Sequence, residues 1–334
     1  MTPRLLLVHR ARSSFVRDDV EILRRHFEVI ELEARAPLTP APWTIVRAVA
    51  RADIVLCWFA SWHAVVPLLL ARALGRPGVV IVGGYDVAAM PEIGYGLQRG
   101  GASRALSRLA LRAAARVVPF SRAALGEARA NAGVPEGKLA LVPLGVADTG
   151  AVPLGTRDIA LSVARVDESN LTRKGLDETA RTARLLAPAE TVIAGEIADA
   201  AVAARLRALG GSTLRLAGRV SDAELAALYA RAAAYLQLSR HEGFGMSVAE
   251  AMRAGCVPVV TRVGSLPELV GDLGEYVASP EEAAAAVRRA RDAPPDRRSA
   301  IAARIRTEYP LERRAQLLPE LLFSLLDGGS PPRR

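Results

Sequence analysis

Two glutamates, Glu242 and Glu250, stand on either side of a Gly-Phe-Gly turn. An apolar run precedes the turn at 234–238, and a helix-forming run follows it at 247–253. Backbone N–H groups of such a glycine loop, together with the partial positive charge of a helix N-terminus, favour a bound phosphate. Ionised carboxylates accept hydrogen bonds from sugar hydroxyls. The combination indicates a sugar nucleotide as ligand.

Glu250 also has an interpretation that needs no ligand. Ser247 and Glu250 have the spacing of a capping box, in which the two side chains satisfy N–H groups at the start of a helix. The same spacing recurs at Ser221/Glu224, Ser265/Glu268 and Ser279/Glu282. On the box alone Glu250 is structural, whereas Glu242 precedes the helix and has no capping duty.

Composition narrows the class of protein. With 334 residues, of which 51% are hydrophobic, the chain can form two domains of ordinary size. The net charge of +9 favours anionic partners, but only 4% of the residues are aromatic, so nucleic acid is not expected. Apolar runs are too short for a membrane span or a signal peptide. Two cysteines, Cys57 and Cys256, fit a reducing cytosol, and we expect a cytoplasmic protein.

The basic residues are almost all arginine. Lys138 and Lys174 are the exceptions among 44, and a lysine in such a chain indicates either a need for a compact ammonium group or chance codon usage. Arginines 104, 108, 112 and 116 recur every four residues and predict one cationic helix stripe. That stripe suits peripheral contact with an anionic membrane, at its inner face; the alternative is a solvated helix face.

Short apolar runs alternate with helical patterns along the whole chain. In the first half we expect strands at 5–8, 27–32, 54–59, 79–82, 116–119 and 139–142, and helices at 18–25, 62–74, 103–115 and 122–132. In the second half we expect strands at 159–163, 191–194, 213–217, 234–238, 257–260 and 275–277. Helices are expected there at 175–186, 199–209, 222–231, 247–254, 266–270, 281–292 and 311–326. The alternation is typical of α/β proteins with parallel sheets.

Two further features organise the chain. The loop-rich segment 143–157 is the best domain boundary, and Pro319 should kink or divide the last helix. Two α/β halves place a ligand at the carboxyl ends of their strands. A dinucleotide fingerprint, a zinc-ligand cluster, an Asp-x-Asp pair and a Gly-x-Ser-x-Gly elbow are all missing from the sequence, so we expect neither a nicotinamide enzyme, a catalytic metal nor an acyl hydrolase.

Five sequence blocks in order resemble the retaining glycosyltransferases of family 4. They lie at 142–146, 163–165 with 174–177, 216–225, 242–260 and 264–270. The resemblance implies the GT-B fold, with two Rossmann-like domains facing each other across a cleft and a C-terminal helix packing back on the N-terminal domain. It implies an acceptor-side domain at 1–150 plus about 311–330. The domain that binds the nucleotide sugar would be 151–310.

The resemblance also implies roles for matching residues. Arg165 and Lys174 would bind the donor diphosphate and stabilise the leaving group without a metal ion. Glu242 would hold the donor sugar as a third catalytic residue, and Glu250 would bond the ribose hydroxyls. The remaining donor-binding residues would be Gly243, Phe244, Gly245 and Met246, which form the turn, and Val220, whose backbone would contact the nucleobase.

The implied reaction is the retaining transfer of a hexose-type sugar from a nucleoside-diphosphate sugar to an acceptor hydroxyl. The acceptor would be a glycan, a lipid-linked sugar or a small molecule, and no cofactor would be required. Two alternatives remain: a nucleotide-sugar epimerase of the same fold, and a basic binding protein without catalysis. The donor base, the sugar, the acceptor and the oligomeric state are not determined by the sequence.

The first half departs from the family pattern in two places. Many relatives have a glycine pair after the first strand, where this chain has His9. Many also have a histidine after the strand expected at 79–82, where this chain has Gly83, Gly84 and, at the strand end, Asp86. These four residues are the acceptor-side candidates, with Asp86 preferred; His63 is another substitute for the missing histidine, or the role is absent.

Overall fold

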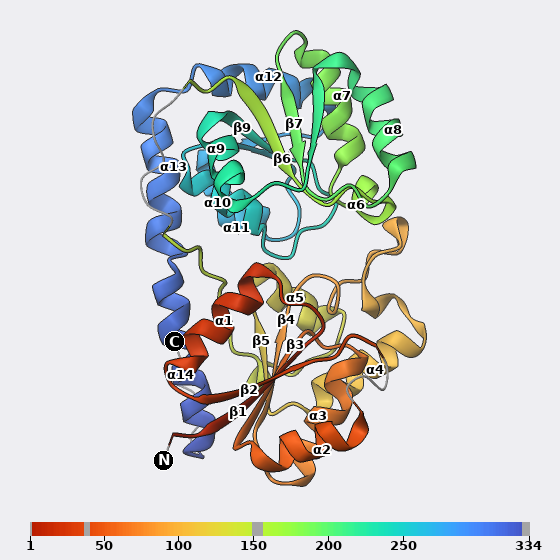
Figure 1. Cartoon of the computed structure of the whole chain (residues 1–334), viewed down its shortest axis with the longest axis vertical. Helices are drawn as coiled ribbons and strands as arrows, with labels where there is room; N and C mark the ends of the chain where they lie inside the picture. The colour runs from red at the N-terminus through yellow and green to blue at the C-terminus, as the bar shows by residue number, and fades with distance from the viewer. Residues whose placement is uncertain (1, 37–40, 149–155, 329–334) are drawn as a thin grey trace. The chain divides into compact units, whose positions relative to one another are not determined.

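The structure is a computed structural model that describes residues 2–36, 41–148 and 156–328. The chain divides into two compact units (Figure 1), Met1–Gly145 with Leu311–Arg334, and Val146–Pro310. The boundary between the two units, after Gly145, falls within the loop-rich segment 143–157. Each unit is an α/β structure with one parallel sheet.

The first sheet has the order β2-β1-β3-β4-β5, with all neighbours parallel. Its strands are β1 (Arg4–His9), β2 (Glu28–Glu33), β3 (Ile54–Trp58), β4 (Gly78–Val82) and β5 (Arg116–Pro119). The helices are α1 (Ser14–Arg24), α2 (Pro42–Arg51), α3 (Trp62–Ala73), α4 (Gly101–Ala113), α5 (Arg122–Ala130) and α14 (Leu311–Leu326), with 3-10 turns at Pro91–Ile93, Leu97–Arg99 and Glu136–Lys138. Strands β3 and β4 are buried along their whole length, as in a parallel sheet covered on both faces.

Helices α2, α3 and α4 pack side by side over one face of this sheet. Right-handed connections require this, because the chain moves in one direction across the sheet from β2 to β5. Helix α1 contacts α14, and the rings of Phe27 and Phe323 stack 4.8 Å apart. The expectation that the C-terminal helix packs on the first domain is therefore confirmed. The helix is continuous through Pro319 and is not divided there.

The second sheet has the order β11-β10-β9-β6-β7-β8 and is also parallel. Its strands are β6 (Ile159–Val163), β7 (Thr191–Ala194), β8 (Leu214–Gly218), β9 (Ala232–Gln237), β10 (Val257–Val260) and β11 (Glu275–Tyr276). The helices are α6 (Glu168–Arg173), α7 (Leu176–Leu186), α8 (Ala200–Gly210), α9 (Asp222–Arg231), α10 (Met246–Arg253), α11 (Leu266–Val270), α12 (Pro280–Arg291) and α13 (Pro295–Glu308), with 3-10 turns at Gly211–Thr213 and Gly271–Leu273.

Several expectations about elements were wrong. The strand expected at 139–142 is reduced to one bridge, between Leu139 and Val117, and Pro143, which has no N–H group, follows it. Arg116 lies on β5, because α4 ends at Ala113, so the four-arginine helix stripe does not exist as predicted. Helices α2, α6 and α13 were missed. Within the described residues, no helix combines the length and apolar character needed to cross a bilayer.

Candidate functional site

Lys174 and Glu242 meet at the carboxyl edge of the second sheet. The Lys174 Nζ atom donates a hydrogen bond of 2.5 Å to Glu242 Oε2, and the two side chains are 16% and 9% exposed. Lys174 follows α6, and Glu242 lies in the loop after β9. Of the three predicted catalytic residues, these two are brought into direct contact.

Two glycines make this approach sterically feasible. Gly175 has φ +62°, and a Cβ atom there would overlap the carbonyl oxygen of Leu238 at the end of β9. Gly264 has φ +52°, and a Cβ atom there would overlap the carbonyl oxygen of Glu242 itself. Both positions require glycine, since other residues are strained in the left-handed region even without a clash. They hold the backbone around Lys174 and Glu242 together.

Buried polar side chains hold the Glu242 carboxylate in place. Gln237 Nε2 donates to Glu242 Oε2 at 3.2 Å and to Ser239 Oγ at 2.7 Å. Ser265 donates its N–H and its hydroxyl to the Glu242 carbonyl oxygen, at 3.1 and 3.2 Å. The side chain and backbone of Glu242 are therefore fixed by separate partners.

The charge of Glu242 follows from its surroundings. Burial raises the pKa of the carboxyl group, but the charges of Lys174 and Arg173 outweigh burial and hold the pKa below its ordinary value. The carboxylate therefore stays ionised at neutral pH. An ionised, largely buried carboxylate with one cationic partner can also accept hydrogen bonds from ligand hydroxyls.

Glu250 does not form the predicted capping box with Ser247. Helix α10 begins at Met246, its N-cap is Gly245 with φ 91°, and no side chain caps it. Glu250 Oε2 instead accepts a hydrogen bond of 2.9 Å from the hydroxyl of Tyr229, on α9. The prediction failed because the left-handed glycine starts the helix before Ser247, which moves Ser247 into the first turn. The box at Ser221 and Glu224 is confirmed.

The turn at 243–245 leads directly into α10. The first helical hydrogen bond runs from Ala249 N to Gly245 O, 2.9 Å. The N–H groups of Met246 and the two residues after it lie in the first turn, where a helix supplies them with no partner. The side chain of Phe244 is buried against Tyr309, with ring centroids 5.7 Å apart, so only its backbone is suited to a ligand contact.

Arg165 and Val220 lie in loops of the same unit. The Arg165 guanidinium is 57% exposed and pairs with Asp167 at 3.7 Å and with Glu196 at 3.4 Å. Arg165 therefore pairs with Asp167 and Glu196, whereas Lys174 pairs with Glu242. Val220 is half-buried between β8 and α9. Within the described residues, groups of three or more metal-ligating side chains are not found.

The acceptor-side candidates gather where β1 and β4 end. His9 is buried, with Nε2 3.0 Å from Glu31 Oε1. Asp86 is 1% exposed and accepts hydrogen bonds from Ala60 N at 2.9 Å and Gly83 N at 3.0 Å. Gly84 starts the turn that bonds back to Ala88. The Asp86 carboxylate thus fixes two loop backbones.

Three ring nitrogens near these strand ends are buried without a hydrogen-bond partner among the described residues: His9 Nδ1, His63 Nδ1 and Trp58 Nε1. Burial lowers the pKa of His63 to about 4, and its Nε2 donates to the Trp58 carbonyl oxygen at 2.8 Å. The neutral ring therefore presents Nδ1 as an acceptor. Unpaired buried polar atoms are costly, so these three ring nitrogens reduce the stability of the first unit.

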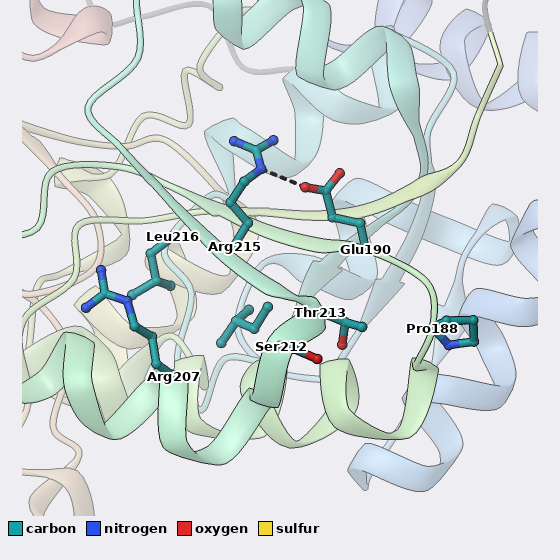
Figure 2. Close-up of a pocket in the computed structure, with 8 residues that line it drawn as sticks. Pro188, Glu190, Arg207, Ser212, Thr213, Arg215 and Leu216 are labelled. Atoms are coloured by element: carbon teal, nitrogen blue, oxygen red, sulfur yellow. Dashed lines mark hydrogen bonds and ion pairs between the residues drawn. The ribbon is translucent and has the colours of Figure 1, made fainter.

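Sequence reasoning missed Tyr229, Gln237 and Trp58 as parts of these clusters. Tyr229 lies 21 positions from its partner Glu250. Gln237 and Trp58 lie five positions from Glu242 and His63, but both stand in apolar strands, so no motif marks them. A cavity of about 510 Å³ also escaped prediction (Figure 2). It lies at the amino ends of β7 and β8, where Arg215 pairs with Glu190 at 2.7 Å. Glu242 lies at the opposite edge of the sheet, where the strands end.

Residues 157–292 match the family model described as glycosyl transferases group 1. O-antigen chain mannosyltransferase B of Escherichia coli is 45% identical over 69 residues, which cover 21% of this chain and 18% of that protein. GDP-mannose:cellobiosyl-diphosphopolyprenol alpha-mannosyltransferase of Komagataeibacter xylinus is 39% identical over 92 residues, 27% of this chain and 23% of that protein. The matches therefore span about a fifth of the length of these curated relatives.

Solved structures resemble the chain over nearly its whole length. A glycosyltransferase from Rickettsia africae ESF-5 has a TM-score of 0.75 at 15% identity and covers 98% of this chain and 100% of that one. Anabaena Alr3699/HepE in complex with UDP and glucose has a TM-score of 0.75 at 15% identity, with 96% and 100% coverage. At such identity the likeness is one of fold, and it confirms the expected α/β, GT-B fold class. Residues 157–292, within the second unit, are thus the part of the chain that is similar to the glycosyl transferases group 1 family.

Proposed function

We propose that this chain is a glycosyltransferase that moves a hexose from a nucleoside-diphosphate sugar to an acceptor hydroxyl. The observation that carries the proposal is the contact of Lys174 with Glu242, immediately before the glycine turn that opens α10. A cation, an ionised carboxylate and free N–H groups of a helix start are the groups that a sugar diphosphate needs. All of them lie within the segment that matches the family.

Each group has a distinct role in this proposal. The diphosphate of the donor binds at the start of α10, between Lys174 and Arg165, and both cations stabilise the charge that develops on it. The Glu242 carboxylate accepts hydrogen bonds from the donor sugar. Glu250 reaches the ribose with the oxygen that does not bond Tyr229.

The reaction exchanges one bond at the anomeric carbon. The bond from that carbon to the diphosphate oxygen breaks, and the electron pair leaves with the nucleoside diphosphate. The acceptor oxygen bonds the same carbon from the same face, so the configuration is retained, and the hydroxyl proton passes to the leaving diphosphate. Positioning and charge stabilisation supply most of the rate enhancement.

Mannose is the first donor sugar to test. Three relatives that match 56 to 92 residues of this chain are named mannosyltransferases, one of them with GDP-mannose in its name. The acceptor would bind near His9, His63 and Asp86, because these residues lie at or after the carboxyl ends of β1, β3 and β4, the edge at which α/β sheets bind their ligands.

The decisive experiment measures release of nucleoside diphosphate. The protein is incubated with GDP-mannose or UDP-glucose, with and without a mixture of oligosaccharide and polyprenyl-linked acceptors. We expect release from one donor, a glycosylated product by mass spectrometry, and a loss of about 10²–10³-fold in Lys174→Ala. Lys138→Ala is the matched control, because Lys138 bonds backbone carbonyls of the first unit, at Arg112 and Ala114.

Other outcomes separate the rival functions. Conversion of the donor to an isomeric nucleotide sugar, without product, would identify an epimerase. Absence of both binding and release over the donor panel would indicate a binding protein without catalysis. Loss of activity in EDTA, restored by magnesium, would refute the metal-independent mechanism while leaving the transferase intact.

A further inference from the structure

The outer surfaces of α2, α3 and α4 are unusually apolar. Of the ten large apolar side chains exposed in the described residues, six lie on these helices. They are Trp43 (66% exposed), Val46 (48%), Val66 (46%), Leu69 (39%), Leu106 (39%) and Leu109 (39%). Each pair is three residues apart on its own helix, so each forms an outward stripe. The inward stripes, which include Val49, Leu68 and Leu111, pack in the core of the sheet.

The same three helices carry only positive charge. None of them contains Asp or Glu, whereas they contain arginines at 47, 51, 72, 104, 108 and 112. Arg108 is held by Gln98 and the Asn131 carbonyl. The side chains of Arg47, Arg51, Arg72, Arg104 and Arg112 have no hydrogen-bond or ion-pair partner in the described part of the chain.

We propose that this basic apolar face, formed by the exposed residues of α2, α3 and α4, binds the surface of an anionic phospholipid bilayer. Apolar stripes flanked by arginine on adjacent helices combine the two contributions to interfacial binding: apolar burial at the acyl boundary and attraction to anionic headgroups. Trp43, the most exposed apolar side chain, suits the headgroup level, where indole rings are favoured. The inference does not depend on the proposed transferase activity.

Two other occupants fit the surface less well. In a symmetric dimer through this face, the cationic face of one copy would oppose that of the other, and repulsion would oppose association. A nucleic acid would neutralise the arginines but would leave the six apolar side chains exposed. A bilayer satisfies both sets of groups.

The test uses the full chain, without nucleotide sugar, in sedimentation with vesicles. Vesicles of equimolar phosphatidylglycerol and phosphatidylcholine are compared with pure phosphatidylcholine at low and high salt. We expect binding to the anionic vesicles that falls with salt, because surface charges are screened. Arg47→Gln with Arg112→Gln should weaken binding by about fivefold per arginine. Trp43→Ala with Leu109→Ala should also weaken it.

Matched controls lie on the second unit. Leu185 and Ile197 are similarly exposed, so Leu185→Ala with Ile197→Ala controls for lost apolar surface. Arg205→Gln with Arg207→Gln, both exposed on α8, controls for lost charge. The proposal is overturned if the protein ignores anionic vesicles at low salt, or if the control variants weaken binding as much. It is also overturned if Trp43→Ala with Leu109→Ala dissociates a dimer instead.

Discussion

Lys174 and Glu242 lie 68 positions apart in sequence, yet their side chains form a hydrogen-bonded ion pair of 2.5 Å. The pair joins the end of α6 to the loop after β9, so it fixes the position of two catalytic candidates at once. The family resemblance implies that Lys174 binds the donor phosphate and that Glu242 binds the donor sugar. Their contact agrees with the proposed function, in which the two side chains bind adjacent parts of one donor molecule.

Stability measurements on this pair should show strong coupling. Lys174→Met or Glu242→Gln alone leaves a largely buried partner without its counterpart, and each should reduce the free energy of unfolding by about 3 kcal/mol. The double variant should lose less than the sum, as urea denaturation would show. The exposed pair Arg181 and Glu178 is the control, with a coupling below about 0.5 kcal/mol. Additive losses at Lys174 and Glu242 would contradict the coupling.

Tyr229 and Glu250 allow the structural and ligand roles of Glu250 to be separated. Tyr229→Phe removes one hydrogen bond of 2.9 Å and should reduce the free energy of unfolding by about 1 kcal/mol, with little change in nucleotide affinity. Glu250→Gln should weaken nucleotide binding about tenfold, since a charged acceptor for the ribose is lost. Isothermal titration with the nucleoside diphosphate measures both. Equal affinity in wild type and Glu250→Gln would leave Glu250 structural.

Much of the fold could be predicted because parallel strands are continuous apolar runs. The bounds of β5, β6, β7 and β10 agree with the sequence expectation. The C-terminal helix was also placed correctly. Helix α6 was missed because it has only six residues, too few for a periodic pattern, and is started by the Asp167 side chain accepting from Asn170 N. Such local capping is not visible in hydrophobic periodicity.

The site was predictable in part. Motif spacing indicated Lys174 and Glu242, but their direct pairing depends on Gly175 and Gly264, which allow backbone approaches that no spacing encodes. The capping box at Ser247 failed for a related reason, because Gly245 begins the helix earlier. Roles of Arg165, Val220 and the turn residues stay predictions that donor binding must test.

Asp86 should make stability depend on pH in an unusual direction. Burial raises the pKa of its carboxyl from 3.8 to about 7, although N–H groups of Ala60 and Gly83 lower it. The folded state therefore holds the proton more tightly than the unfolded chain, and folding is disfavoured as pH rises from about 4 towards about 7. The free energy of unfolding of wild type, minus that of Asp86→Asn, should fall over this range. A flat or rising difference in urea titrations would contradict the assignment.

Gly175 should be far less replaceable than a glycine in open space. Gly175→Ala places a methyl group against the Leu238 carbonyl oxygen and should displace Lys174, so both stability and nucleotide affinity fall. Gly94 has a similar left-handed conformation, with φ 65° and ψ 19°, and nothing within 4 Å of an added Cβ atom, so Gly94→Ala measures the conformational cost alone, about 1–2 kcal/mol. Thermal denaturation and nucleotide titration compare the two. Equal effects would show that the close approach is unimportant.

Arg314 should determine whether α14 stays attached to the first unit. Its guanidinium forms two hydrogen bonds with Asp19 on α1, at 2.6 and 2.8 Å, and two more with the carbonyl oxygens of Val142 and Pro143. Arg314→Met leaves the fully buried Asp19 carboxylate without its cation and should cost about 3–5 kcal/mol. Hydrogen exchange should show faster exchange in α14, whereas Glu312→Gln, at an exposed position of the same helix, should change little. Unchanged protection of α14 in Arg314→Met would mean that apolar packing, including Phe27 on Phe323, is sufficient to hold the helix.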